Sequence, residues 1–164
     1  MGAAALNNHV VALIVWLALV IAGYVLIDHF SAPDPVVRSR ASGSYEIVVP
    51  VARDGHYYLE GAVNGEAVTF LVDTGASYVS IGSDVAARAN LPLGVAGFFT
   101  TANGRVEGRI VRSQTVAADI FEVSGITVAV MPARSEFGLL GQNFLSYFTV
   151  SQSDGKLILR AREP

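Results

Sequence analysis

A run of 18 residues without a charged or strongly polar side chain, from Val10 to Ile27, separates the N-terminal part of this 164-residue chain from the rest. As an α-helix it would be about 27 Å long at ~1.5 Å per residue, close to the ~30 Å hydrocarbon core of a bilayer. A single small domain rarely buries a helix that is apolar on all sides. The run therefore predicts a transmembrane helix over residues 10–27, preceded by an N-terminal flank of residues 1–9.

A cleaved signal peptide is the alternative interpretation of this run. Residues 1–9 contain no Lys or Arg, and the apolar run exceeds the usual length of about 7–15 residues. The one small-x-small cleavage candidate, near Ser31–Ala32, is followed at once by Pro33. These features favour an uncleaved single-span anchor. On its C-terminal side, Arg38 and Arg40 weakly favour a cytoplasmic location for the rest of the chain.

The overall composition argues against several function classes. The chain has 11 Lys and Arg against 14 Asp and Glu, a net charge of -3, so it offers no basic patch for nucleic acid. It has no cysteine, which excludes disulfides, thiolate metal sites and a cysteine nucleophile. Its three histidines are scattered along the sequence, so we expect no metal site.

Residues 28–44 are predicted to form a tether, because the segment SAPDPVVRSRASGS within them holds two prolines and four serines. From Tyr45 onward the sequence changes to short β-rich runs. Asn64–Gly65, Asn103–Gly104 and Asp154–Gly155 each divide two such runs, and these dipeptides are the strongest short-range signal of a β-hairpin.

Helical signals are few in residues 45–164. Residues 84–91 are predicted to form a helix with Ser83 as its N-cap, and residues 142–147 a second, shorter one. The domain of residues 45–164 is therefore predicted to be all-β with one or two short helices.

An Asp-Thr-Gly sequence follows one of the apolar runs, in the segment FLVDTGAS of Phe70–Ser77. The segment delivers the carboxylate of Asp73 to the end of a strand and turns immediately afterwards. Taken alone this is ambiguous, because Asp, Thr and Gly are all common turn residues. A second segment, FGLLGQNFL at Phe137–Leu145, places two leucines and a glycine just before the second predicted helix.

In this order and spacing, the two segments resemble the motifs of the retropepsin-like aspartic proteases. The resemblance covers about Tyr45–Arg160 and is closest to the membrane-anchored, single-domain bacterial members of that clan. It implies a closed retropepsin-like barrel, hydrolysis of peptide or protein substrates, and no metal or organic cofactor. It also implies a motif that packs beside the Asp73 loop and buries it, formed by Leu139, Leu140 and Gly141.

The resemblance also suggests roles for individual residues. Asp73 would be the catalytic carboxylate, and Thr74 would send its hydroxyl across a subunit interface. Gly75 would permit the tight turn and offer its N–H to the carboxylate, while the small Ala76 would leave room for substrate. A flap that covers substrate would include Thr101, Ala102, Asn103 and Gly104; the alternative is an ordinary surface hairpin.

Aspartic protease chemistry needs two neighbouring carboxylates that share one proton. The ionised carboxylate takes a proton from water, and the protonated one hydrogen-bonds the scissile carbonyl. Only one Asp-Thr-Gly occurs in this chain. The resemblance therefore implies a homodimer with Asp73 from each subunit, in which the C-terminal strand, Lys156–Arg160, pairs with its counterpart across the two-fold axis.

Two positions depart from the retroviral pattern. Ser77 and Gln142 stand where retroviral members carry an acidic residue and an arginine that form an ion pair. This departure leaves open a catalytically inactive retropepsin-like dimer that acts as a membrane-tethered binding module. A plain membrane-anchored β-domain with a coincidental Asp-Thr-Gly is a second alternative, which the correctly placed Leu-Leu-Gly disfavours. Because the bacterial members usually lie outside the cytoplasm, we expect a single-pass inner-membrane protein with a periplasmic domain, despite Arg38 and Arg40.

Overall fold

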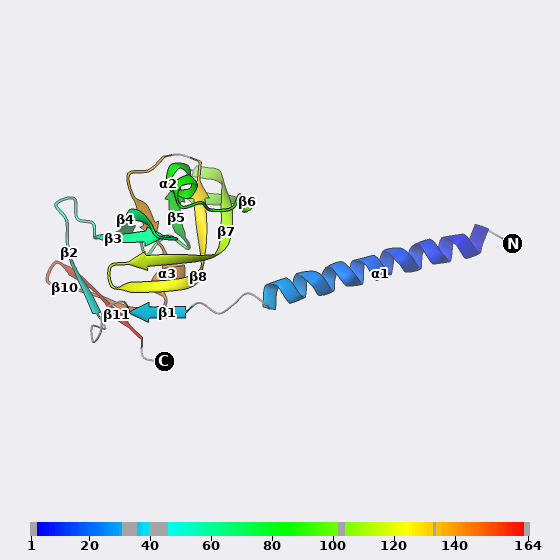
Figure 1. Ribbon diagram of the computed structural model, residues 1–164, viewed down its shortest axis with the longest axis horizontal. Coiled ribbons are helices and arrows are strands. Elements are labelled where there is room, and N and C mark those ends of the chain that lie inside the picture. The colour runs from blue at the N-terminus through cyan, green and yellow to red at the C-terminus, as the bar shows by residue number, and fades with distance from the viewer. Residues whose placement is uncertain (1–2, 31–35, 40–45, 102–103, 133, 163–164) are drawn as a thin grey trace. The chain divides into compact units, whose positions relative to one another are not determined.

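The computed structural model describes residues 3–30, 36–39, 46–101, 104–132 and 134–162 (Figure 1). The chain divides into two compact units, Met1–Pro33 and Asp34–Pro164.

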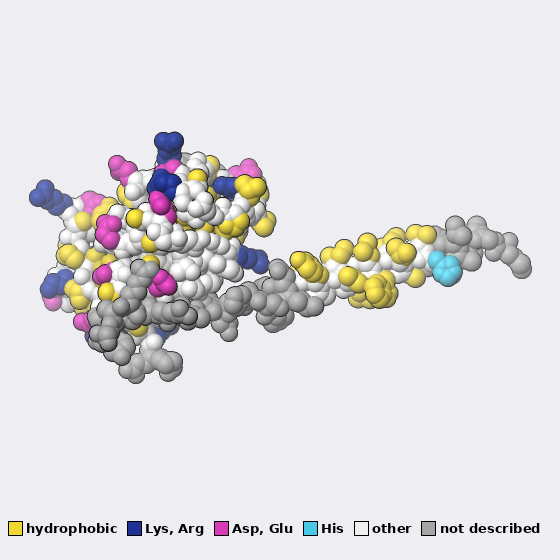
Figure 2. Space-filling model, in the orientation of Figure 1, with side chains coloured by type: hydrophobic (Ala, Val, Ile, Leu, Met, Phe, Trp, Pro, Cys, Tyr) yellow, Lys and Arg dark blue, Asp and Glu magenta, His cyan; other side chains and the backbone are white. Residues whose placement is uncertain are grey.

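The first unit is one helix, α1 (Ala3–Phe30). Its segment His9–Leu26 is long and apolar enough to cross a membrane, and none of that segment is buried against other described residues. Figure 2 shows hydrophobic side chains along the visible face of this segment, apart from one histidine. Since a signal sequence can form the same kind of helix, the span over residues 10–27 stays a prediction.

The described part of the second unit is mostly β-structure, with two short helices, α2 (Ser83–Arg88) and α3 (Gln142–Leu145). Its strands in chain order are β1 (Val36–Ser39), β2 (Glu46–Pro50), β3 (Tyr58–Val63), β4 (Glu66–Val72), β5 (Val79–Gly82), β6 (Val95–Thr101), β7 (Gly104–Ala118), β8 (Phe121–Met131), β9 (Gly138–Leu140), β10 (Phe148–Ser153) and β11 (Lys156–Ala161).

Six strands close into a barrel in the order β8-β5-β9-β4-β3-β7, and β7 pairs back onto β8. The all-β closed barrel with short helices is therefore confirmed. β6 pairs with the first half of β7, and β1 pairs with β8. Thus β1 lies inside the range predicted as a tether. Its four residues are too short a run to show a strand pattern among the surrounding prolines and serines.

The local turn predictions hold where the structure describes them. Asn64 and Gly65 have φ of 48° and 87°, and Asp154 and Gly155 have φ of 49° and 68°. Left-handed backbone at both central residues is what a tight two-residue hairpin requires. Asn103 lies outside the described residues.

The prediction that Ser83 caps α2 is wrong. The N-cap position is Gly82, no side chain makes a capping bond there, and Ser83 is the first helical residue. Its hydroxyl instead donates to the carbonyl oxygen of Pro132 at 3.1 Å. The helix ends at Arg88, three residues before the predicted end, and Asn90 follows in the left-handed region with φ 51°. The second predicted helix is confirmed as α3, within residues 142–147.

A separate three-stranded sheet has the order β10-β11-β2. In Figure 1 it lies at the end of the second unit opposite to α2 and β6. Because β11 is the middle strand, Leu159 already pairs with Val150 on one side and Ile47 on the other. The prediction that Lys156–Arg160 pairs with its counterpart in a second subunit is therefore wrong, since both edges of β11 have partners within the chain.

One hydrophobic core joins the barrel to this sheet. Phe148, at the start of β10, packs against Phe121 of β8 and Phe144 of α3, with ring centroids 4.7 and 5.2 Å apart. All three rings are fully buried. The position of α3, between the barrel and β10, is consequently fixed by packing on both sides.

Candidate active site

Asp73 follows directly after β4 and is half-buried. Its backbone N–H donates to the carbonyl oxygen of Leu140 at 3.2 Å. This bond continues the parallel pairing of β4 with β9, in which Val72 stands opposite Leu140. The two segments that the sequence analysis singled out thus meet at the end of β4, and the structure places Leu139, Leu140 and Gly141 beside the Asp73 loop.

The loop after Asp73 turns back on the carboxylate. The backbone N–H of Gly75 donates to Oδ1 of Asp73 at 2.8 Å, and that of Ala76 donates to the Asp73 carbonyl at 3.3 Å. A Cβ atom on Gly75 would lie 3.2 Å from the same Oδ1. Glycine therefore lets this backbone approach the carboxylate without crowding it. Thr74, at the tip of the turn, is exposed.

The first turn of α3 bonds to the other side of this loop. The N–H groups of Gln142 and Asn143 donate to the carbonyls of Ala76 and Ser77, at 2.8 and 3.2 Å. In addition, the Gln142 side-chain amide donates from Nε2 to the carbonyl oxygen of Thr74 at 2.9 Å. These bonds fix the loop along most of its length.

Asn143 is a site residue that the sequence analysis missed. Its Oδ1 accepts a hydrogen bond from the N–H of Val79 at 2.8 Å, and its Nδ2 donates to the carbonyl of Thr127 at 2.7 Å. The side chain thus joins β5, which follows the Asp73 loop, to β8. A polar residue directly before the two buried residues of α3, Phe144 and Leu145, was the signal that could have identified it.

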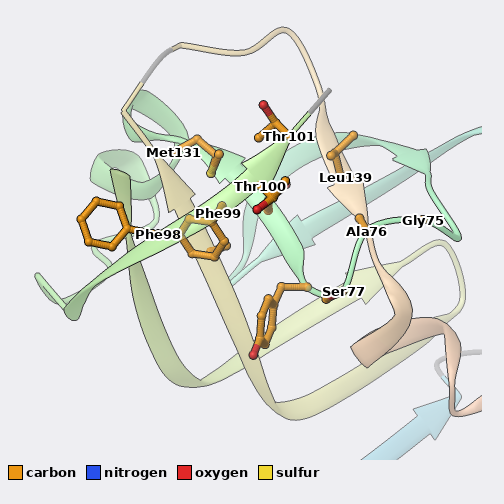
Figure 3. A pocket seen from close by; sticks show the side chains of 12 residues that line it. Gly75, Ala76, Ser77, Phe98, Phe99, Thr100, Thr101, Met131 and Leu139 are labelled. Atoms are coloured by element: carbon orange, nitrogen blue, oxygen red, sulfur yellow. The ribbon is translucent and has the colours of Figure 1, made fainter. Parts of the chain in front are cut away.

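A groove of about 350 Å³ lies between this loop and β6. Figure 3 shows side chains of β6 on one side and Gly75, Ala76 and Ser77 on the other. The rings of Tyr78 and Phe99 meet edge to face across it, with centroids 6.4 Å apart. All described residues that line the groove have uncharged side chains: Gly75, Ala76, Ser77, Tyr78, Ser80, Phe98, Phe99, Thr100, Thr101, Ala129, Met131 and Leu139.

The hairpin of β6 and β7 contains the predicted flap. Thr101 lines the groove, and its hydroxyl donates to the Gly104 carbonyl at 2.9 Å. Gly104 is exposed and left-handed, with φ 104°. Ala102 and Asn103 lie outside the described residues. The sequence analysis did not name Phe98 and Phe99, which are the aromatic side chains that this hairpin brings to the groove.

A loop rich in titratable side chains adjoins the end of β4, where the N–H of Val72 donates to the Tyr57 carbonyl at 2.9 Å. The hydroxyl of Tyr58 donates to Asp54 at 2.7 Å, which lowers the pKa of the Asp54 carboxyl and raises that of the Tyr58 phenol. His56 Nδ1 lies 3.4 Å from the same carboxylate. Among the described residues, no group of three His, Asp or Glu could hold a metal ion.

A closed barrel, an Asp-Thr-Gly loop at the end of one strand, and a Leu-Leu-Gly segment bonded beside it together define the class of retropepsin-like aspartic proteases. Comparison with family models agrees. The family described as gag-polyprotein putative aspartyl protease matches residues 59–147, more than half of the chain, and the chain belongs to that family.

A solved structure supports the same assignment. The crystal structure of a retropepsin-like aspartic protease from Rickettsia conorii is 26% identical, with a TM-score of 0.57, and the match covers 78% of this chain and 94% of that one. Two curated relatives are uncharacterized proteins. One, from Rickettsia prowazekii, is 27% identical over 70% of this chain, and one, from the cobV 5′ region of a Sinorhizobium species, is 30% identical over 68%. The chain spans about half the length of each, since the matches cover 50% of both relatives.

Proposed function

We propose that this protein is a membrane-anchored aspartic endopeptidase, in which Asp73 from each subunit of a homodimer forms the catalytic pair. The observation that supports the proposal is the half-buried Asp73 carboxylate, bonded to the Gly75 N–H, in a loop whose next residues, Gly75, Ala76 and Ser77, line an uncharged groove. Residues 10–27 serve as the anchor, residues 28–44 as the connection and residues 45–164 as the peptidase domain. Thr74, Gly75 and Ala76 support the active-site loop, and the β6–β7 hairpin closes over substrate.

In this mechanism the two Asp73 carboxyls hold one proton between them. The ionised carboxylate takes a proton from a bound water as its oxygen attacks the scissile carbonyl carbon. The protonated carboxyl hydrogen-bonds the carbonyl oxygen and stabilises the charge that develops there. Proton transfer to the amide nitrogen then lets the C–N bond break, which releases an acid and an amine. The uncharged groove favours apolar or neutral side chains of an extended peptide.

A homodimer needs an interface that leaves β11 in place, and the outer edge of β10 is the one we propose. The Arg162 N–H donates to the Tyr147 carbonyl at 3.3 Å, so alternate residues from Tyr147 onward direct their backbone groups toward β11. The backbone groups of Val150 and Gln152 consequently point outward, and no described strand pairs with them.

The two outer strands of this sheet differ in their protection against further pairing. β10 contains neither proline nor a charged residue, whereas β2 carries Glu46 and Pro50, features that block pairing at edges. An antiparallel contact around a two-fold axis at Ser151 would pair Val150 with Gln152 of the second copy. The connection to the site is through α3, whose first turn bonds to the Asp73 loop and whose C-terminal end leads into β10.

We also propose that α1 spans the bacterial inner membrane with the peptidase domain in the periplasm. The length and apolar composition of His9–Leu26 support the span, and the bacterial sources of the relatives support the membrane type. Reporters fused after Pro164 test the orientation. A reporter that is active only in the periplasm should give a signal, and one that is active only in the cytoplasm should give none.

The full chain, purified in lipid nanodiscs and profiled against a peptide library, tests the activity. We expect cleavage with a bell-shaped pH profile on the acid side of neutrality, unaffected by EDTA or thiol reagents. Asp73→Asn should abolish it, and Asp154→Asn, a matched change in an exposed turn, should not. Loss of activity in EDTA that zinc restores would exclude the aspartic mechanism. Peptide binding in the groove without any cleavage would instead support the inactive binding module.

A further inference from the structure

The Gln142 side chain and the Asp73 carboxylate bond to opposite sides of a single peptide group. The carbonyl oxygen of that group belongs to Thr74 and accepts from Gln142 Nε2 at 2.9 Å. Its N–H belongs to Gly75 and donates to Asp73 Oδ1 at 2.8 Å. Two hydrogen bonds and one peptide plane therefore connect an exposed glutamine to the carboxylate.

The planar trans geometry of the Thr74–Gly75 peptide couples the two hydrogen bonds. Because the peptide unit is planar and its C=O and N–H point in opposite directions, a donor that fixes the oxygen also fixes the direction of the N–H. A hydrogen bond accepted at the oxygen further polarises the N–H and strengthens the bond that it donates. Gln142 thus acts on the orientation of Asp73 through the Thr74–Gly75 peptide.

This side-chain bond is separate from the bonds that hold α3 in place. The backbone N–H groups of Gln142 and Asn143, together with the Asn143 side chain, already attach the helix to the loop and to β5 and β8. Gln142 itself is exposed. Removing its amide should therefore leave the fold intact and free only the Thr74–Gly75 peptide.

From these contacts, and resting on the proposed function, we infer that Gln142 is a positioning residue for the Asp73 carboxylate. Its neutral amide stabilises the active-site loop in a chain that has serine rather than an acidic residue at position 77. The loop would then be held without an ion pair at these two positions, and its geometry should depend little on salt.

Three substitutions of Gln142 distinguish the effect of its hydrogen-bond donor from the effect of its side-chain size. Gln142→Met and Gln142→Glu retain the length of the side chain but, above the pKa of the new carboxyl, donate no hydrogen bond. Gln142→Arg retains a donor and serves as the rescue variant. Ser146→Ala, at an exposed position just after α3, is the matched control. Each is made in the full chain in nanodiscs, with two readouts: hydrolysis of a peptide substrate, and hydrogen exchange at the Gly75 amide.

We expect the Met and Glu variants to lower kcat by about tenfold, equivalent to about 1.4 kcal/mol of transition-state stabilisation, with KM nearly unchanged. Exchange at the Gly75 amide should become several-fold faster in both variants, with an unchanged melting temperature. The Arg and Ser146→Ala variants should resemble the wild type. Gly75 exchange equal to wild type in the Met and Glu variants would overturn the inference, and so would equal loss in the Arg variant.

The two readouts also separate this inference from the proposed function. If the wild-type chain shows no hydrolysis that depends on Asp73, the proposed function fails, whereas Gly75 exchange still reports whether Gln142 holds the peptide. If hydrolysis depends on Asp73 but none of the Gln142 variants alters kcat, the proposed function stands and the positioning role is wrong.

Discussion

Gly141 lies against the backbone of Tyr78 so closely that no side chain fits between them. A Cβ atom on Gly141 would overlap the Tyr78 carbonyl and lie 2.9 Å from the carbonyl oxygen of Ala76. This close approach is what lets the first turn of α3 bond to the loop that follows Asp73. The glycine of the Leu-Leu-Gly motif is therefore required by the distance between two backbones.

Gly141→Ala should consequently lower the free energy of unfolding by about 2–3 kcal/mol, the cost of forcing an extra carbon into a packed contact. Gly97→Ala is the matched control, because the nearest atoms to a Cβ there belong to side chains that can move, those of Ile110 at 3.1 Å and Phe99 at 3.8 Å. Chemical denaturation of both variants checks the difference. Equal destabilisation by the two substitutions would contradict this explanation of the motif.

The flap proposal predicts a selective effect of Gly104→Val. Valine is strained at φ 104°, but among the described residues, its chain neighbours aside, none lies within 4 Å of a Cβ at this position, so the cost in stability should be only about 1–2 kcal/mol. Turnover should fall more than stability does, because a distorted hairpin tip closes poorly over the groove. Gly65→Val makes the same kind of change, at φ 87°, in the β3–β4 hairpin. Equal loss of turnover in the two variants would contradict the flap proposal and indicate that the β6–β7 hairpin has only a structural role.

The loop beside β4 predicts an acid-dependent contribution to stability. The Tyr58 hydroxyl lowers the pKa of Asp54, so the folded state favours the ionised carboxylate. This stabilisation is present above the ordinary Asp pKa of about 3.9 and is lost as the pH falls through the folded-state value. Tyr58→Phe removes the hydroxyl but retains the ring that meets Phe137 edge to face at 5.7 Å. Melting temperatures of both proteins between pH 3 and 7 should differ most at neutral pH, and a constant difference would contradict the assignment.

The cysteine-free sequence makes the β10 interface testable by cross-linking. With the two-fold axis at Ser151, the two copies of that residue form a non-hydrogen-bonded pair about 4.5 Å apart at Cα, within disulfide range. Ser151→Cys should therefore form a covalent dimer rapidly on mild oxidation. Ser153→Cys is the control, since its counterpart would lie about 13 Å away at ~3.3 Å per residue. Equal rates for the two variants, or no cross-link at Ser151, would exclude this interface.

The features that could be predicted from the sequence are those decided by local chemistry. Asn64–Gly65 and Asp154–Gly155 specify their hairpins because left-handed backbone is accessible to these residues at little cost. Asp73 could be placed at a strand end because the apolar run before it stops at the Asp-Thr-Gly turn.

The features that were missed depend on contacts between distant segments. The position of β11 between β10 and β2, and the pairing of β1 with β8, are decided by which edges the rest of the fold leaves open. No pattern within Lys156–Arg160 distinguishes a middle strand from an edge. The bonds of Gln142 and Asn143 likewise join positions more than 60 residues apart, at separations of 68 and 64 residues.

The central claim, a site that needs one Asp73 from each of two chains, is tested most directly by mixing chains. Wild-type protein is co-reconstituted with about a threefold excess of Asp73→Asn protein, so that random pairing leaves about one quarter of wild-type chains with a wild-type partner. We predict that peptidase activity per wild-type chain falls to about that fraction, and that the same excess of Asp154→Asn chains causes no such fall. Activity per wild-type chain that is unchanged by the Asp73→Asn excess would contradict the shared site.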